Sequence, residues 1–210
     1  MFGFGIKMLL SSIIAQVQGN IFSVLLGRFS TKADVGYFSQ GVKWASMGTQ
    51  VVNGMVFSVA QPIFAQTNKD KLRQAFVFRK IIRFISFISF PCMLGLAFIS
   101  KDFISVINQD FIFCVPILQL YCIWGAFTPI LMLYAQIVVA YGRSDFYFWI
   151  SVVFAIIQIS LVSFVLQFGI YWMAFSIVLS SYIYLLVWHI FVATLLPIKF
   201  FQIVKDIIPY

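Results

Sequence analysis

A lysine stands within a long apolar stretch, among polar residues that recur at helical spacing. Gln40, Lys43 and Gln50 follow one another at intervals of three and seven residues, which is one and two turns of an α-helix. At about 100° per residue their side chains fall within one arc of about 80°, and the opposite face is apolar. The same arc takes in Gly36, Met47, Gly54, Ser58 and Gln61. The stretch 35–65 therefore predicts a helix with one polar stripe.

The preceding apolar stretch repeats this pattern more weakly. Gln16 and Asn20 share one face of a helix over 6–28, while Lys7, Ser11 and Gln18 share another. Polar faces on apolar helices have two interpretations. They hold helices together through close packing and hydrogen bonds, or they line a polar cavity.

Lys43 favours the cavity. It lies about eight residues into its apolar stretch, or about 12 Å deep at 1.5 Å per residue. A charge at that depth costs a few kcal/mol unless water or an anion compensates it. All six acidic residues are expected outside the apolar stretches, so an anionic ligand, or an acid elsewhere, is the expected partner of Lys43. The alternative is that Lys43 extends its amine to the nearer membrane surface.

These faces require helices in a membrane. The chain has 210 residues, of which 62% are apolar and only 10% charged, with a mean hydropathy of +1.02. A soluble domain contains about 25% charged residues, and a helix needs roughly 20 apolar residues to cross a bilayer. We expect an all-α polytopic membrane protein with no nucleic-acid partner, its net charge of +8 notwithstanding.

About six transmembrane helices are predicted in residues 1–196, and residues 197–210 are amphipathic and predict a short interfacial helix. The six stretches are 6–28, 35–65, 81–100, 115–140, 148–168 and 170–196. The distribution of basic residues predicts an orientation in which both ends of this segment lie in the cytoplasm. Lys7, six basic residues from Lys69 to Arg83, Arg143, Lys199 and Lys205 then lie inside, and Arg28, Lys32 and Lys101 outside.

The chain offers no catalytic constellation. His189 is its only histidine and reads as a packed structural residue near a helix end. No residues are spaced for a metal, so neither a cofactor nor a metal is expected, nor an enzymatic activity.

An ordered series of motifs resembles the Wzx-type polysaccharide flippases, which belong to a superfamily with the MATE drug antiporters. The series matches the start of that family's second half. It departs at Ser39–Val42, where the family has an arginine-containing motif, and Lys43 is the expected substitute. The motifs are Phe4–Leu10, Asn20, Gly27–Phe38, Pro62–Ala65, Phe90–Leu96, Pro116–Gln119 and Gly142–Asp145.

The resemblance implies one bundle of a two-bundle transporter of the bacterial inner membrane. Its substrate would be a polyprenyl-pyrophosphate-linked oligosaccharide, flipped by alternating access for polysaccharide export. Lys43, Gln40, Gln50, Gln16, Asn20 and Lys7 are the candidates for the cavity. The abrupt ends predict a chain truncated at both ends, partnered by a missing N-terminal half or by a second copy. The alternatives are a MATE-like antiporter half and a non-transporting membrane fragment or scaffold.

Overall fold

The protein is built from helices. The computed structural model describes residues 2–67 and 70–207, and all regular structure in these ranges is helical, which confirms the all-α class. Two 3₁₀ segments, η1 (Gln109–Cys114) and η2 (Leu166–Phe168), join longer helices. The α-helices are α1 (Phe2–Phe29), α2 (Lys32–Thr67), α3 (Lys71–Ile107), α4 (Val115–Gly125), α5 (Thr128–Ala140), α6 (Ser144–Val165), α7 (Ile170–Leu195) and α8 (Phe200–Ile207).

Four helices within the described ranges are long and apolar enough to cross a membrane: α1, α3, α6 with η2, and α7. A fifth candidate is the pair of η1–α4 and α5, which is bent by 41° between Gly125 and Thr128. The helix α2 is at least as long as most of these helices, but its polar stripe makes it less apolar than they are, and it is not among the four. The predicted stretch 115–140 is therefore two helices, and a sixth span along α2 stays a prediction.

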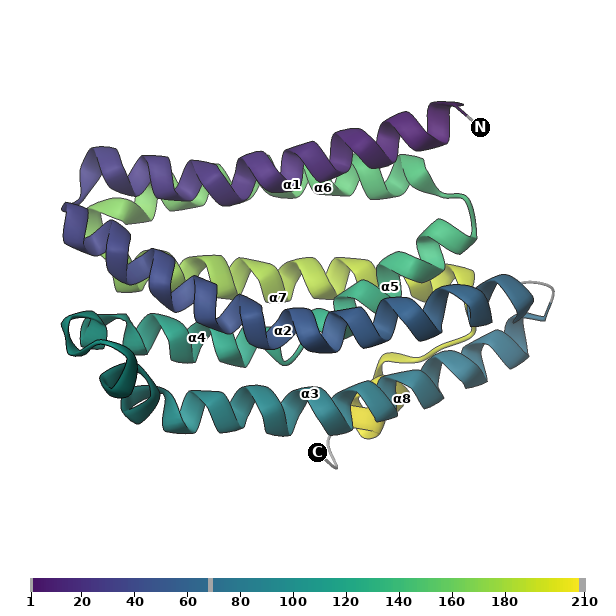
Figure 1. Ribbon diagram of the computed structural model, residues 1–210. Helices are drawn as coiled ribbons and strands as arrows, with labels where there is room; N and C mark the ends of the chain where they lie inside the picture. Colours follow the sequence, from purple (N-terminus) through teal and green to yellow (C-terminus); the bar gives the residue numbers. More distant parts are fainter. Residues whose placement is uncertain (1, 68–69, 208–210) are drawn as a thin grey trace.

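The long helices run back and forth between two ends of one bundle (Figure 1). The start of α1, the α2–α3 and α5–α6 connections and the α7–α8 connection share one end. The α1–α2 turn, η1 and the α6–α7 turn share the other. This is the grouping that the basic residues predict, although Lys69 lies outside the described residues. Which end faces the cytoplasm stays a prediction.

Large side chains fill the interior near the end of the bundle where α7 stops. Phe64, Phe78, Tyr134 and Trp188 are almost completely buried there, between α2, α3, α5 and α7. The outer surface is also apolar: Phe98 on α3 is 89% exposed. Such exposure is unfavourable in water and is what a lipid-facing helix requires.

Close contact between α2 and α4 depends on a glycine. Gly41 is buried, and a Cβ atom there would lie 2.9 Å from Cγ2 of Ile117 and 3.1 Å from the backbone nitrogen of Leu118. A small residue lets two helix backbones approach where lipid offers no hydrophobic drive between them.

The helices extend beyond the predicted spans, so most of the acidic residues lie at helix ends rather than in loops. Asp34 and Thr31 form a capping box at the start of α2, in which the Thr31 amide donates to the carboxylate of Asp34 at 3.1 Å. Asp70 caps α3 by accepting the amides of Leu72 and Arg73, each at 3.0 Å. Asp102 falls within α3 and Asp145 in the first turn of α6.

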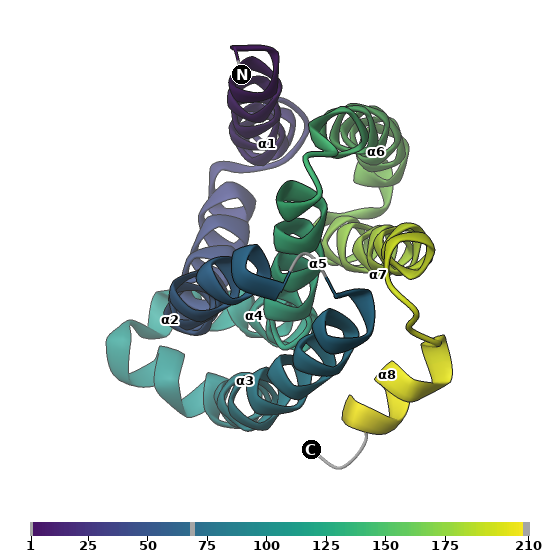
Figure 2. The ribbon, with the colours of Figure 1, turned by 90° about the vertical axis from the view of Figure 1, so that its right-hand side faces the viewer.

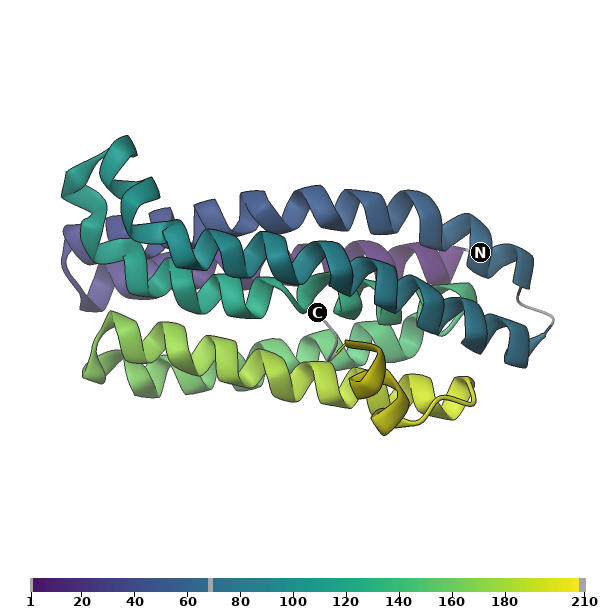
Figure 3. The same ribbon diagram turned by 90° about the horizontal axis from the view of Figure 1, so that it is seen from below.

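The predicted interfacial segment contains α8, which folds back from the end of α7 and packs on α3 (Figures 2 and 3). Its Asp206 is buried and accepts hydrogen bonds from Arg79. Residues 208–210 lie outside the described residues, and the position of α8 on a membrane surface stays a prediction.

Candidate functional site

The polar stripe of α2 points away from the core of the bundle. Lys43, Gln50 and Ser58 are exposed, and Gln40 is half-buried. The buried residues Ala45, Val52 and Val56 lie on the opposite face of α2. The side chain of Gln61, the last member of the stripe, lies outside what the structure describes. From Lys43 to Ser58 the described residues of the stripe therefore form an open surface.

The amine of Lys43 is held only by an aromatic neighbour. Its Nζ lies 5.3 Å from the ring centroid of Trp44, and the Trp44 ring in turn packs edge-on against Phe103 at 5.2 Å. The ion pairs within the described ranges are those of Lys7, Arg79 and Arg83, so Lys43 has none there. A cation–π contact stabilises the amine modestly and leaves it able to attract an anion.

Gln16 and Asn20 lie on the outer face of α1. Both are exposed, and the Nδ2 of Asn20 donates to the backbone oxygen of Gln16 at 3.0 Å. They lie roughly 160° around α1 from Ser11 and Gln18, which face α6. These residues and the stripe of α2 thus lie on the outer side of the pair α1 and α2, which form one flank of the bundle (Figure 2).

The other polar face of α1 joins helices together. Lys7 forms an ion pair with Asp145 at the start of α6, and Gln18 donates to the side-chain oxygen of Gln158. The Nε2 of Gln158 donates onward to the Oγ of Ser180 on α7 at 3.0 Å. The structure thus sets Lys7 apart from the other five candidates, because it faces α6.

Sequence reasoning could not name these partners. Gln158 and Ser180 are polar residues in otherwise apolar helices, which signals an interhelical contact but not its partner. The same holds for Asp206, whose place in an amphipathic segment gives no sign that it is buried against α3. His189 is placed as expected: its Nδ1 lies 2.9 Å from the hydroxyl of buried Tyr134.

The fold and its apolar surface define an all-α multi-pass membrane protein. More narrowly, the chain belongs to the family described as "Polysaccharide biosynthesis protein", whose sequence model matches residues 1–116. This confirms the resemblance to polysaccharide flippases. No solved structure matches the chain.

Three curated relatives carry names from the same field. The chain is 28% identical over 164 residues to the "Teichuronic acid biosynthesis protein TuaB" of Bacillus subtilis, which covers 76% of this chain and 34% of that protein. It is 28% identical to an "Uncharacterized membrane protein in cps region" of Klebsiella pneumoniae, over 80% of this chain and 34% of that protein. It is 25% identical to the "Lipopolysaccharide biosynthesis protein WzxC" of Escherichia coli, over 71% of this chain and 30% of that protein. The chain thus spans about a third of the length of these relatives.

Proposed function

We propose that this chain supplies one bundle of a flippase that moves polyprenyl-pyrophosphate-linked oligosaccharides across the bacterial inner membrane. The observation that carries the proposal is the outward polar stripe of α2, which includes Lys43 and leaves it without an ion pair to any described residue. In lipid such a surface is unfavourable, so it needs a facing wall, water and an anion. The family and the names of its relatives support a saccharide intermediate as the cargo.

In this proposal the flank of α1 and α2 is one wall of the transport cavity. Lys43 attracts the pyrophosphate, and the amides of Gln40, Gln50, Gln16 and Asn20 offer donors and acceptors to the sugar. The lysine is a compact cation with rotatable donors, which suits a group that must be bound and released. Lys7 serves the bundle itself by holding α1 to α6.

The facing wall comes from a second bundle, either an N-terminal half or a second copy of this chain. The two bundles open the cavity to one side of the membrane and then to the other, with both ends of this segment in the cytoplasm. A MATE-like antiporter is the less favoured alternative, because intramembrane acids would be expected to bind its cations, whereas the stripe of α2 has Lys43 instead.

Substitution of Lys43 tests the proposal in a protein that contains both bundles. Lys43→Ala should abolish glycan export at normal protein levels, because the stripe of α2 then has no cation to bind the pyrophosphate. Lys43→Arg should retain part of the activity, because it keeps the charge. Lys101→Ala is the matched control, since it removes an exposed lysine at the far end of α3. Normal export by Lys43→Ala would contradict the proposal and would mean that Lys43 only extends its amine to the membrane surface.

A further inference from the structure

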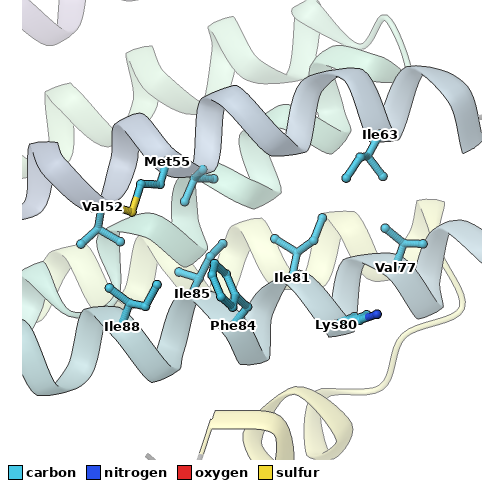
Figure 4. A pocket seen from close by; sticks show the side chains of 10 residues that line it. Val52, Met55, Ile63, Val77, Lys80, Ile81, Phe84, Ile85 and Ile88 are labelled. Carbon is cyan, nitrogen blue, oxygen red and sulfur yellow. The ribbon is translucent and has the colours of Figure 1, made fainter.

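An apolar groove runs between α2 and α3, on the side of α2 away from the polar stripe. It encloses about 420 Å³ (Figure 4). Val52, Met55 and Ile63 line it from α2, and Ile81 and Ile88 from α3. Val52 lies about 180° around α2 from Lys43, so the groove does not belong to the proposed cavity wall.

One basic side chain lies in this apolar lining. Lys80 is the polar member among the residues that line the groove, and it lies toward the end of the bundle where the α2–α3 connection is found (Figure 4). It is exposed and directly precedes the predicted span 81–100. With the span as predicted, its amine lies at the level of the lipid headgroups and the groove below it enters the hydrocarbon.

The length of the groove matches one leaflet. Along α3 the residues that line the groove run from Val77 to Ile88, over which the helix rises about 16.5 Å at 1.5 Å per residue. One leaflet of hydrocarbon is about 15 Å thick, half of a bilayer core. Phe84, which is 61% exposed, stands on the lipid-facing side of the groove, so a chain within it has an aromatic ring beside it and the bilayer beyond.

The charge near the groove is positive. Exposed Arg73 lies only about 20° around α3 from Lys80, two turns closer to the helix start. The nearby carboxylate of Asp206 is already bound by Arg79 and Arg83. An apolar groove under two basic side chains is complementary to a molecule with an acyl chain and an anionic phosphate. We propose that the α2–α3 groove binds one acyl chain of an anionic phospholipid, with the phosphate on Lys80.

Photolabelling in vesicles tests the site with two probes. The purified chain is placed in phosphatidylcholine vesicles that contain a small fraction of either phosphatidylglycerol or phosphatidylcholine with a diazirine in the acyl chain. After irradiation, the labelled peptides are mapped by mass spectrometry. The phosphatidylglycerol probe should label 52–63 and 77–88 more strongly than the phosphatidylcholine probe.

Variants separate the headgroup from the groove. Lys80→Ala should lower phosphatidylglycerol labelling of these segments about fivefold. One basic residue near an anionic membrane surface strengthens binding by about that factor. It should leave phosphatidylcholine labelling unchanged, and Lys101→Ala should change neither. Met55→Trp, which fills the mouth of the groove, should reduce labelling by both probes. Equal labelling of the wild-type protein by the two probes, or no effect of Lys80→Ala, would overturn the proposal.

Two further results would assign the groove to another occupant. Loss of the phosphatidylglycerol label on addition of an equimolar amount of polyprenyl phosphate would identify the groove as a site for the prenyl chain. Loss of the label in a longer protein that contains this segment would show that another helix covers it. Either result would overturn the phospholipid site. Neither would affect the outcome of the Lys43 experiment, so the phospholipid site and the proposed flippase function are tested independently.

Discussion

Arg79 on α3 donates two hydrogen bonds to Asp206 on α8, from Nε to Oδ2 at 2.6 Å and from Nη2 to Oδ1 at 3.1 Å. Arg83 adds a third contact, with its Nε 2.9 Å from Oδ1. The carboxylate is buried while the two guanidinium groups reach solvent, so the geometry satisfies Asp206 without burying two cations. This contact ties the end of the described chain to a helix more than a hundred residues earlier.

Asp206→Ala should release α8 from α3. Hydrogen bonds to charged groups contribute about 1.5–3 kcal/mol, so we expect a loss of about 2 kcal/mol in the docking of this helix. Limited proteolysis in detergent should then cleave the connection 196–199 faster than in the wild-type protein. Lys205→Ala removes an exposed charge from the same helix and should leave the cleavage rate unchanged. Equal cleavage of all three proteins would contradict the role of the contact.

Gln158→Leu should weaken the association of α1, α6 and α7. Gln158 joins Gln18 to Ser180, and interhelical hydrogen bonds in membranes contribute about 0.6–1.7 kcal/mol. The midpoint of thermal unfolding in detergent should fall accordingly. Gln16→Leu provides the control on α1, because it changes an exposed glutamine that faces away from α6 and should leave the midpoint in place. A larger decrease of the unfolding midpoint in Gln16→Leu than in Gln158→Leu would mean that the outer and the packed face of α1 are assigned the wrong way round.

The two ends of the bundle should lie on opposite sides of the membrane. In a protein whose Cys92, Cys114 and Cys122 are replaced, a membrane-impermeant thiol reagent added outside should label Asp110→Cys and not Lys71→Cys. The excess of basic residues near the α2–α3 connection is the reason. The opposite labelling pattern would invert the proposed orientation.

The chain alone should insert into a membrane but not export glycan. In the proposed flippase the flank of α1 and α2 supplies one wall of the cavity, and the facing wall must come from a partner. Expression in a flippase-deficient host, with and without a co-expressed N-terminal half, measures this directly. We expect export only with the partner. Export by the chain alone would show that two copies form a complete transporter.

The helices could be predicted from the sequence because long apolar stretches can satisfy their backbone hydrogen bonds in lipid only as helices. Sequence reasoning also identified the two polar faces of α1 and the stripe of α2, since helical periodicity sets which residues share a face. It could not decide which face packs inside, because the contact of Gln18 with Gln158 depends on how α6 lies against α1. The bend between Gly125 and Thr128 was also missed, since apolarity alone does not distinguish one long helix from two short ones.

The low apolarity of α2 has a consequence for biogenesis. A segment enters the bilayer from the translocon when its summed transfer free energy is favourable, and one central lysine costs about 2.5–3.5 kcal/mol on that scale. The helix α2 is therefore poorly recognised when it emerges alone, while its neighbours α1 and α3 are strongly apolar. It should enter the membrane together with α3, as a hairpin folded at the α2–α3 connection. The polar stripe of α2 should thus make its insertion depend on the helix synthesised after it.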